Sequence, residues 1–185
     1  MGIIQLFFIG LGLSMDAFAV SICQGLKMKR LDFKQTVIIA LFFGGFQGIM
    51  PFIGWLIGKN FETYITSFDH WIAFALLVII GGKMIIESFE SNDSCEVTSS
   101  LKDLILLAVA TSIDALAVGI TFAFLKMSIL LPVLLIGIIT FVFCIFGVII
   151  GNKFGSHYKN KAEFLGGIIL ILIGLKILLE HLNII

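Results

Sequence analysis

Two aspartates stand inside apolar stretches of this chain, each within the same short phrase. The phrases are Ser14-Met15-Asp16-Ala17-Phe18-Ala19-Val20 and Ser112-Ile113-Asp114-Ala115-Leu116-Ala117-Val118. An aspartate at the centre of a membrane helix costs about 2.5 to 3.5 kcal/mol on insertion scales, so such a residue usually serves a polar path, a proton or a cation. The duplicated carboxylate therefore indicates cation transport.

Neutral oxygen donors occur near these carboxylates or in the apolar stretches that follow them. Carboxylate, hydroxyl and amide oxygens suit hard divalent cations such as Mg²⁺, Ca²⁺ or Mn²⁺ better than copper. Pro51 removes the backbone N–H that would bond the Gln47 carbonyl, so Gln47 could offer both a side-chain and a main-chain oxygen. The predicted metal ligands are Asp16, Asp114, Gln47, Ser14, Thr111, Ser112 and Thr140.

Each neutral donor also has an ordinary structural interpretation. A Ser or Thr in a membrane helix commonly bonds its own backbone, and a Gln commonly bonds a neighbouring helix. Both interpretations stay open for these residues. For the aspartates a transport role is favoured, because no Lys or Arg lies on the helical stripe around either one. Two Lys/Glu pairs with a spacing of four residues, Lys83 with Glu87 and Lys176 with Glu180, are predicted to be local ion pairs at helix ends.

The composition requires a lipid environment for these residues. Hydrophobic residues make up 59% of the 185 residues, charged residues make up 13%, and mean hydropathy is +1.15, whereas a soluble domain carries roughly 25% charge. A spanning helix needs about 20 mostly apolar residues. Cutting the chain at its polar clusters predicts six such helices, at Ile3–Cys23, Thr36–Ile57, Trp71–Phe89, Leu101–Leu125, Ile129–Ile150 and Phe164–Leu182.

Basic residues predict how these helices are oriented. They gather between the first two predicted helices and between the last two, and cytoplasmic loops carry an excess of Lys and Arg. The two loops are therefore expected in the cytoplasm, with both termini outside. The residues concerned are Lys27, Lys29, Arg30 and Lys34 in the first loop and Lys153, Lys159 and Lys161 in the second.

An internal repeat extends beyond the aspartates. Gly54-Trp55-Leu56-Ile57-Gly58 resembles Gly147-Val148-Ile149-Ile150-Gly151, and Gly81-Gly82-Lys83-Met84-Ile85-Ile86-Glu87 resembles Gly174-Leu175-Lys176-Ile177-Leu178-Leu179-Glu180. Three helices per copy is an odd number, so the second copy must cross the membrane in the opposite orientation, as in many secondary transporters. The predicted fold is an all-α integral membrane protein with two inverted three-helix repeats, residues 1–89 and 101–185, joined by a polar cytoplasmic linker at 90–100.

Five motifs then occur in order along nearly the whole chain. They are Gly12-Leu13-Ser14-Met15-Asp16-Ala17-Phe18-Ala19, Phe46-Gln47-Gly48-Ile49-Met50-Pro51-Phe52-Ile53-Gly54-Trp55, His70-Trp71-Ile72-Ala73-Phe74, Gly81-Gly82-Lys83-Met84-Ile85-Ile86-Glu87 and Ala110-Thr111-Ser112-Ile113-Asp114-Ala115-Leu116-Ala117-Val118-Gly119. With them the chain resembles the MntP-type manganese efflux pumps of bacteria, relatives of the lysine-exporter superfamily. The resemblance implies Mn²⁺ export across the inner membrane and maps the family's membrane aspartates onto Asp16 and Asp114. Gln47 stands where some relatives carry an acid, which leaves the number of coordinating carboxylates open.

The expected partners follow from these features. The chain has no GxxxxGK[ST] loop and no expected nucleotide-binding domain, so a nucleotide is not an expected partner. A nucleic acid is not an expected partner either. No enzyme activity and no cofactor are expected; Mn²⁺ is the transported substrate, the lipid bilayer is the environment, and protons are the expected coupling ion in an antiporter. The alternatives are export of cadmium or an amino acid, or a membrane assembly protein that transports nothing. The sequence leaves open whether the chain forms a homo-oligomer.

Overall fold

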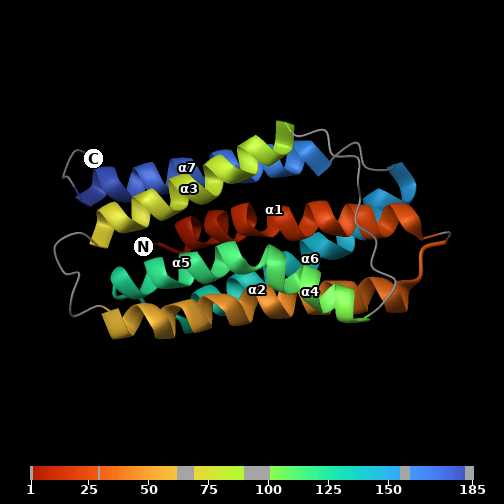
Figure 1. Ribbon diagram of the computed structural model, residues 1–185, viewed down its shortest axis with the longest axis horizontal. Helices are drawn as coiled ribbons and strands as arrows, with labels where there is room; N and C mark the ends of the chain where they lie inside the picture. Colours follow the sequence, from red (N-terminus) through yellow and green to blue (C-terminus); the bar gives the residue numbers. More distant parts are fainter. Residues whose placement is uncertain (1, 29, 62–68, 90–100, 155–158, 182–185) are drawn as a thin grey trace.

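The computed structural model describes residues 2–28, 30–61, 69–89, 101–154 and 159–181. Within these ranges every regular element is an α-helix, which confirms the predicted all-α class for this part of the chain. The linker expected at residues 90–100 lies outside the described residues. The described helices (Figure 1) are α1 (Ile3–Lys27), α2 (Phe33–Phe61), α3 (Asp69–Phe89), α4 (Leu101–Thr111), α5 (Ile113–Phe124), α6 (Leu130–Phe154) and α7 (Lys159–His181).

Four of the described helical stretches are long and apolar enough to cross a membrane. They are Ile3–Leu26 in α1, Phe33–Asn60 in α2, Leu104–Phe124 across α4 and α5, and Leu130–Lys153 in α6. Helices α3 and α7 contain shorter apolar segments, Phe74–Lys83 and Gly167–Leu179. These lengths agree with a multi-pass membrane protein. Among the described residues, four of the six predicted spans are long and apolar enough to cross a membrane.

The outer surface of the helices is apolar. Large hydrophobic side chains stand exposed on helices across the fold, including Ile4, Ile79, Leu130 and Leu172. A soluble monomer rarely exposes broad apolar patches, because water disfavours them. The exposed side chains are therefore the surface expected to contact lipid.

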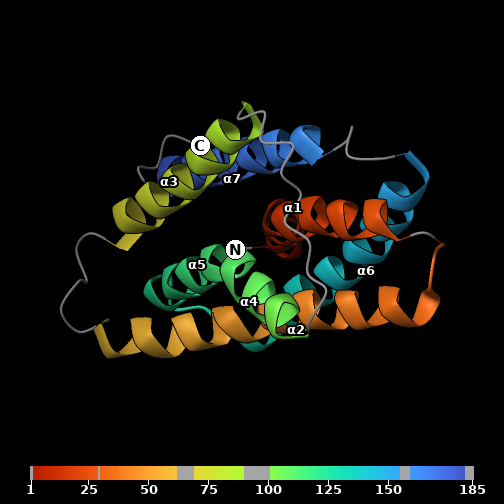
Figure 2. The same ribbon diagram turned by 45° about the vertical axis from the view of Figure 1, so that its right-hand side comes forward.

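The helices pack in a few specific pairs. Helix α1 packs against α6 and α7, α2 packs against α5 and α6, and α3 packs against α7. Both views show α3 and α7 side by side, and α3 also contacts α5 (Figures 1 and 2). In Figure 1 α1 begins and α7 ends at the same end of the long axis, while the α1–α2 connection lies at the other end.

The predicted segment Leu101–Leu125 is interrupted near its middle. Helix α4 ends at Thr111 and α5 begins at Ile113, with Ser112 between them at φ −101° and ψ 2°. The Ser112 N–H donates to the Val109 carbonyl at 3.1 Å, three residues back instead of the four of a regular α-helix. The Ser112 hydroxyl donates to the same carbonyl at 3.0 Å. Side-chain bonds to the preceding turn compete with the helical ladder, which accounts for an interruption without Gly or Pro.

Glycines allow two of these helix pairs to approach closely. A Cβ on Gly54 of α2 would collide with the Leu116 carbonyl oxygen of α5, and a Cβ on Gly151 of α6 would collide with the Ile22 carbonyl oxygen of α1. Each neighbour is backbone and cannot rotate away. Both glycines therefore serve helix packing, the common role of small residues in membrane helices.

We expect Gly54→Ala to destabilise the protein by about 1 to 3 kcal/mol, because the added methyl group forces α2 and α5 apart. Gly45→Ala on the same helix is the matched control, since a Cβ at Gly45 meets no atom within 4 Å. The control should be neutral or slightly stabilising, because Ala favours helices more than Gly does. Thermal unfolding of both purified variants in detergent tests this. Equal melting temperatures would contradict the close approach of α2 and α5.

Candidate cation site

Each of the four candidate membrane spans has at least one predicted ligand near its middle. Asp16, Gln47, Asp114 and Thr140 each lie within two residues of the midpoint of their own span. A helix rises about 1.5 Å per residue, so each is within about 3 Å of its span's centre. Polar residues from four separate stretches therefore lie near the middle of their candidate spans.

Helix α1 contributes Asp16 and Ser14. Asp16 is half-buried, whereas Ser14 is fully buried and donates its hydroxyl hydrogen to the Leu11 carbonyl at 2.7 Å. Ser112 makes the equivalent bond to Val109 in the second copy of the motif. The backbone-bonding interpretation of both serines is confirmed. Their oxygens keep lone pairs, so a ligand role for them stays a prediction.

Gln47 joins α2 to α1 next to this motif. Its side chain is buried, and its amide Nε2 donates to the Leu13 carbonyl at 3.0 Å. This bond confirms the helix-joining interpretation for the amide nitrogen. Leu13 precedes Asp16 by three residues, so this bond also holds the Gln47 side chain beside the α1 segment that carries Asp16. Coordination through the amide oxygen is untested and stays a prediction.

Asp114 lies in the first turn of α5, directly after the interruption at Ser112. Its side chain is only 13% exposed. The first turn of a helix stabilises a negative charge, because the backbone N–H groups there have no intrahelical partner. Thr111, on the other side of the interruption, donates its hydroxyl to the Leu107 and Ala108 carbonyls at 3.1 and 3.2 Å. The interruption thus holds an anionic side chain at the centre of the span.

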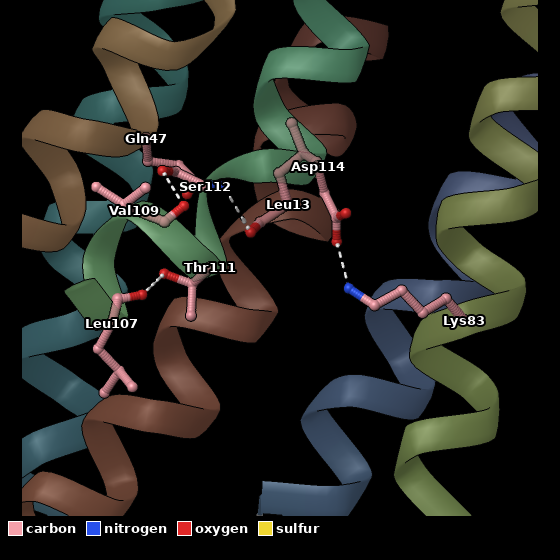
Figure 3. Close-up of polar contacts among 8 residues, drawn as sticks. All are labelled: Leu13, Gln47, Lys83, Leu107, Val109, Thr111, Ser112 and Asp114. Atoms are coloured by element: carbon pink, nitrogen blue, oxygen red, sulfur yellow. Dashed lines mark hydrogen bonds and ion pairs between the residues drawn. The ribbon is translucent and has the colours of Figure 1, made fainter. Parts of the chain in front are cut away.

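Lys83 of α3 approaches this carboxylate from another part of the chain. Its Nζ lies 3.7 Å from Asp114 Oδ2. Figure 3 shows the Asp114 carboxylate directed away from Gln47 and Ser112 and toward Lys83. The sequence argument considered only the helical stripe around each aspartate, and Lys83 reaches Asp114 from another helix. The side chains of Glu87 and Glu180, the predicted local partners of Lys83 and Lys176, lie outside the described part of the structure.

Thr140 of α6 is buried, and its hydroxyl has no hydrogen-bond partner among the described residues. Two contacts show which part of α1 lies beside Thr140. Gly10 of α1 packs against Ile136 and Ile139 of α6, and Gly147 of α6 packs against Phe18 of α1. Thr140 therefore lies between the levels of Gly10 and Phe18 along α1, nearer to Gly10. A buried hydroxyl without a partner requires explanation by a water, an ion or a rearrangement.

No cluster of three or more His, Cys, Asp or Glu side chains occurs among the described residues. The chemistry available at this depth is instead a pair of carboxylates with hydroxyl, amide and backbone oxygens. Such oxygen donors bind hard divalent cations, and a site with few charges releases them more readily than a closed cage of carboxylates.

Comparisons with known proteins agree with a transporter of cations. The family model Mntp, described as "Putative manganese efflux pump", matches residues 30–178. Relatives named "Putative manganese efflux pump MntP" are 59% identical in Desulfitobacterium hafniense (strain Y51), covering 99% of this chain and 97% of the relative, and 51% identical in Clostridium perfringens (strain 13 / Type A), covering 100% and 98%. A third, from Acetivibrio thermocellus, is 54% identical and covers 100% of this chain and 94% of the relative. These relatives are named as pumps, which confirms the prediction that the chain is not an enzyme. No solved structure matches the chain.

Proposed function

Since the chain belongs to the MntP family of manganese efflux pumps, we propose that it exports Mn²⁺ across the bacterial cytoplasmic membrane. The observation that carries this proposal most directly is the position of Asp114. Its carboxylate stands at the centre of an apolar span, in the first turn of a half-helix that begins at an interruption. Transporters use such broken helices to hold ions at the middle of the bilayer. The names of the relatives supply the choice of manganese as the cargo.

The proposed Mn²⁺ site consists of the Asp16 and Asp114 carboxylates with neutral oxygen donors. Two carboxylates balance the charge of one divalent cation. The common depth of these residues in their spans supports their joint role. Mn²⁺ accepts carboxylate, carbonyl and hydroxyl oxygens, and the unpartnered hydroxyl of Thr140 offers one of them. The proposed neutral donors are Gln47, Ser14, Thr111, Ser112 and Thr140.

We further propose six membrane helices arranged as two inverted repeats, with α4 and α5 forming one helix of the second repeat. Corresponding contacts support this arrangement. Gly54 of α2 packs on Leu116 of α5, and in the second copy Gly147 of α6 packs on Phe18 of α1. Both pairs stand at equivalent positions of the repeated phrases. Gly44 of α2 and Gly137 of α6 approach each other's carbonyl oxygens, as expected for helices that meet on a pseudo-twofold axis.

In this arrangement the end of the bundle that carries the α1–α2 connection faces the cytoplasm, because the basic residues gather there. Both termini then lie outside, which agrees with α1 beginning and α7 ending at the same end in Figure 1. The cation would enter from the basic end and leave at the end where α1 begins.

Export of a divalent cation needs an energy source. Moving two positive charges out of a cell against 100 mV costs about 4.6 kcal/mol, at about 2.3 kcal/mol for each charge. We propose proton antiport, in which Asp16 and Asp114 bind Mn²⁺ from the cytoplasm and release it outside as protons replace it. The carboxylates are suited to this exchange because protons and Mn²⁺ compete for the same oxygens.

Uptake of Mn²⁺ into everted membrane vesicles under a proton gradient tests the function and its rivals. We expect Mn²⁺ uptake that excess Mg²⁺, Zn²⁺, Cd²⁺ or lysine does not abolish. Transport of Cd²⁺ or lysine in place of Mn²⁺ would keep the transporter class and overturn the cargo. An absence of flux with folded protein would favour an assembly protein whose aspartates only hold helices together.

A further inference from the structure

The ion pair between Lys83 and Asp114 joins two helices at the depth of the proposed cation site. Lys83 belongs to α3 and Asp114 to α5, and the two helices pack together. Lys83 ends the apolar segment Phe74–Lys83, so its stem starts among apolar residues and its ammonium reaches the centre of the neighbouring span. A lysine in such surroundings needs an anion or water close by. Here the carboxylate of the proposed metal site is within its reach.

The side chains of Lys83 and Asp114 differ in how freely they can move. The Lys83 side chain is 52% exposed, whereas the Asp114 side chain is 13% exposed and belongs to the first turn of α5. The separation of 3.7 Å is also longer than the 2.7 to 2.9 Å of a tight charge-assisted hydrogen bond. A lysine has a flexible four-carbon stem and can move its charge toward a membrane interface. The ammonium is therefore the partner that can leave, and the carboxylate is the partner that stays.

We propose that Lys83 is a tethered cation of the transport site. Its ammonium occupies Asp114 while no metal ion is bound and is displaced when a divalent cation arrives. The inference rests on the proposed function, because it concerns the same carboxylate. The proposal adds Lys83 to the site, a role that no spacing in the sequence indicated. By competing for Asp114, Lys83 lowers the affinity of the site for the metal ion enough for release.

Because an incoming ion must displace Lys83 from Asp114, the site also discriminates between monovalent and divalent cations. An incoming ion must replace an interaction that a single positive charge already makes with Asp114. A monovalent ion such as Na⁺ or K⁺ gains little by this exchange, because it brings the same charge as the ammonium. A divalent ion gains more, since the Coulomb attraction to a carboxylate doubles with the charge. Lys83 therefore excludes abundant monovalent cations from the carboxylate.

The repeat extends the same role to Lys176. It occupies in Gly174-Leu175-Lys176 the place of Lys83 in Gly81-Gly82-Lys83, and its helix α7 packs against α1, which carries Asp16. In the inverted arrangement proposed above, Lys176 has the same position relative to Asp16 as Lys83 has relative to Asp114. Each carboxylate of the site then has its own tethered cation, one from each repeat.

Mn²⁺ binding to purified protein in detergent, followed by isothermal titration calorimetry, tests the proposal with two substitutions of opposite expected effect. Lys83→Met removes the competing charge and keeps the apolar stem, so the Mn²⁺ dissociation constant should fall about fivefold, as the loss of a partly exposed ion pair implies. Lys83→Arg keeps the charge and can bind a carboxylate through two N–H groups, so the dissociation constant should rise by about threefold or more. K⁺ at high concentration should weaken Mn²⁺ binding more in Lys83→Met than in the unaltered protein.

Lys102→Gln is the matched control, because it removes one positive charge from an exposed site at the start of α4. Its dissociation constant should stay within twofold of the unaltered value, which separates displacement at Asp114 from a change in net charge. Unchanged affinity in both Lys83 variants would overturn the proposal and assign the ion pair a structural role. If Lys83→Met does not fold, an unchanged or lowered dissociation constant in Lys83→Arg still overturns it. Failure of the unaltered protein to bind or transport Mn²⁺ would instead refute the proposed function.

Discussion

We expect Mn²⁺ flux to fall by about 100-fold or more when Asp114 is replaced with Asn, and we expect the variant still to fold. Asn keeps the size of the side chain and removes the charge that would hold the cation. Loss of an outer-shell partner of a metal ligand already costs 10- to 100-fold in affinity or activity, so loss of a charged ligand should cost at least as much. Uptake of Mn²⁺ into everted vesicles measures the flux, with expression and size-exclusion elution of each variant measured in parallel. Asp16→Asn should give the same result.

Asp32→Asn is the control for these substitutions. Asp32 is exposed just before α2, where its Oδ1 accepts a hydrogen bond from the Lys34 N–H at 2.9 Å. Asn serves that position nearly as well as Asp, so flux should be unchanged. More than half of the original flux in Asp114→Asn would contradict the site. Loss of folded protein in both mid-span variants, with Asp32→Asn intact, would favour a structural role for the aspartates.

We expect Mn²⁺ accumulation in everted vesicles to disappear when a protonophore discharges the proton gradient. At 100 mV the electrical cost of about 4.6 kcal/mol for a divalent cation corresponds to roughly a thousandfold concentration ratio, which passive movement cannot build in the outward direction. Preloaded Mn²⁺ should leave the vesicles until its electrochemical potential is equal on both sides. Clamping the membrane potential with K⁺ and valinomycin while keeping the pH gradient separates the two driving forces. Accumulation that persists without any proton gradient would refute antiport with protons.

The class of the protein could be predicted from the sequence because it depends on composition. Six apolar runs separated by charged clusters are properties of the chain alone, and the described residues form helices in all six. The boundaries are also close, with Ile3–Cys23 predicted against Ile3–Lys27 observed for α1. Packing between helices was predictable where it depends on Gly54 and Gly58, since small residues four apart favour close approach.

The interruption at Ser112 could not be predicted with the same rules. The segment contains neither Pro nor Gly near its middle, and its apolar composition favours a continuous helix. Three side-chain bonds from Thr111 and Ser112 to the preceding turn accompany the break, whereas Ser14 makes one such bond in α1, which stays continuous. The adjacent Thr111 and Ser112 pair was the available signal. Whether such a pair interrupts a helix depends on how many hydroxyls compete with the backbone hydrogen bonds of one helical turn.

Lys83 was missed for a different reason. Its spacing to Glu87 fits a local ion pair, and sequence spacing describes neighbours on one helix only. The contact with Asp114 joins residues on α3 and α5, so it depends on how those helices pack. The available signal was its place at the end of an apolar segment, together with the equivalent Lys176. Two repeated lysines within mostly apolar helices could have been matched to the two repeated aspartates.

Electron paramagnetic resonance of Mn²⁺ with purified protein tests the central claim most directly. Free aqueous Mn²⁺ gives a sharp signal at room temperature that broadens when the ion is bound, so the loss of signal counts bound ions. We expect the unaltered protein to bind one Mn²⁺ per chain, and the double variant Asp16→Asn with Asp114→Asn to bind none at the same concentration. Equal binding by the two proteins would show that Mn²⁺ is held elsewhere and would contradict a site built on the two mid-span carboxylates.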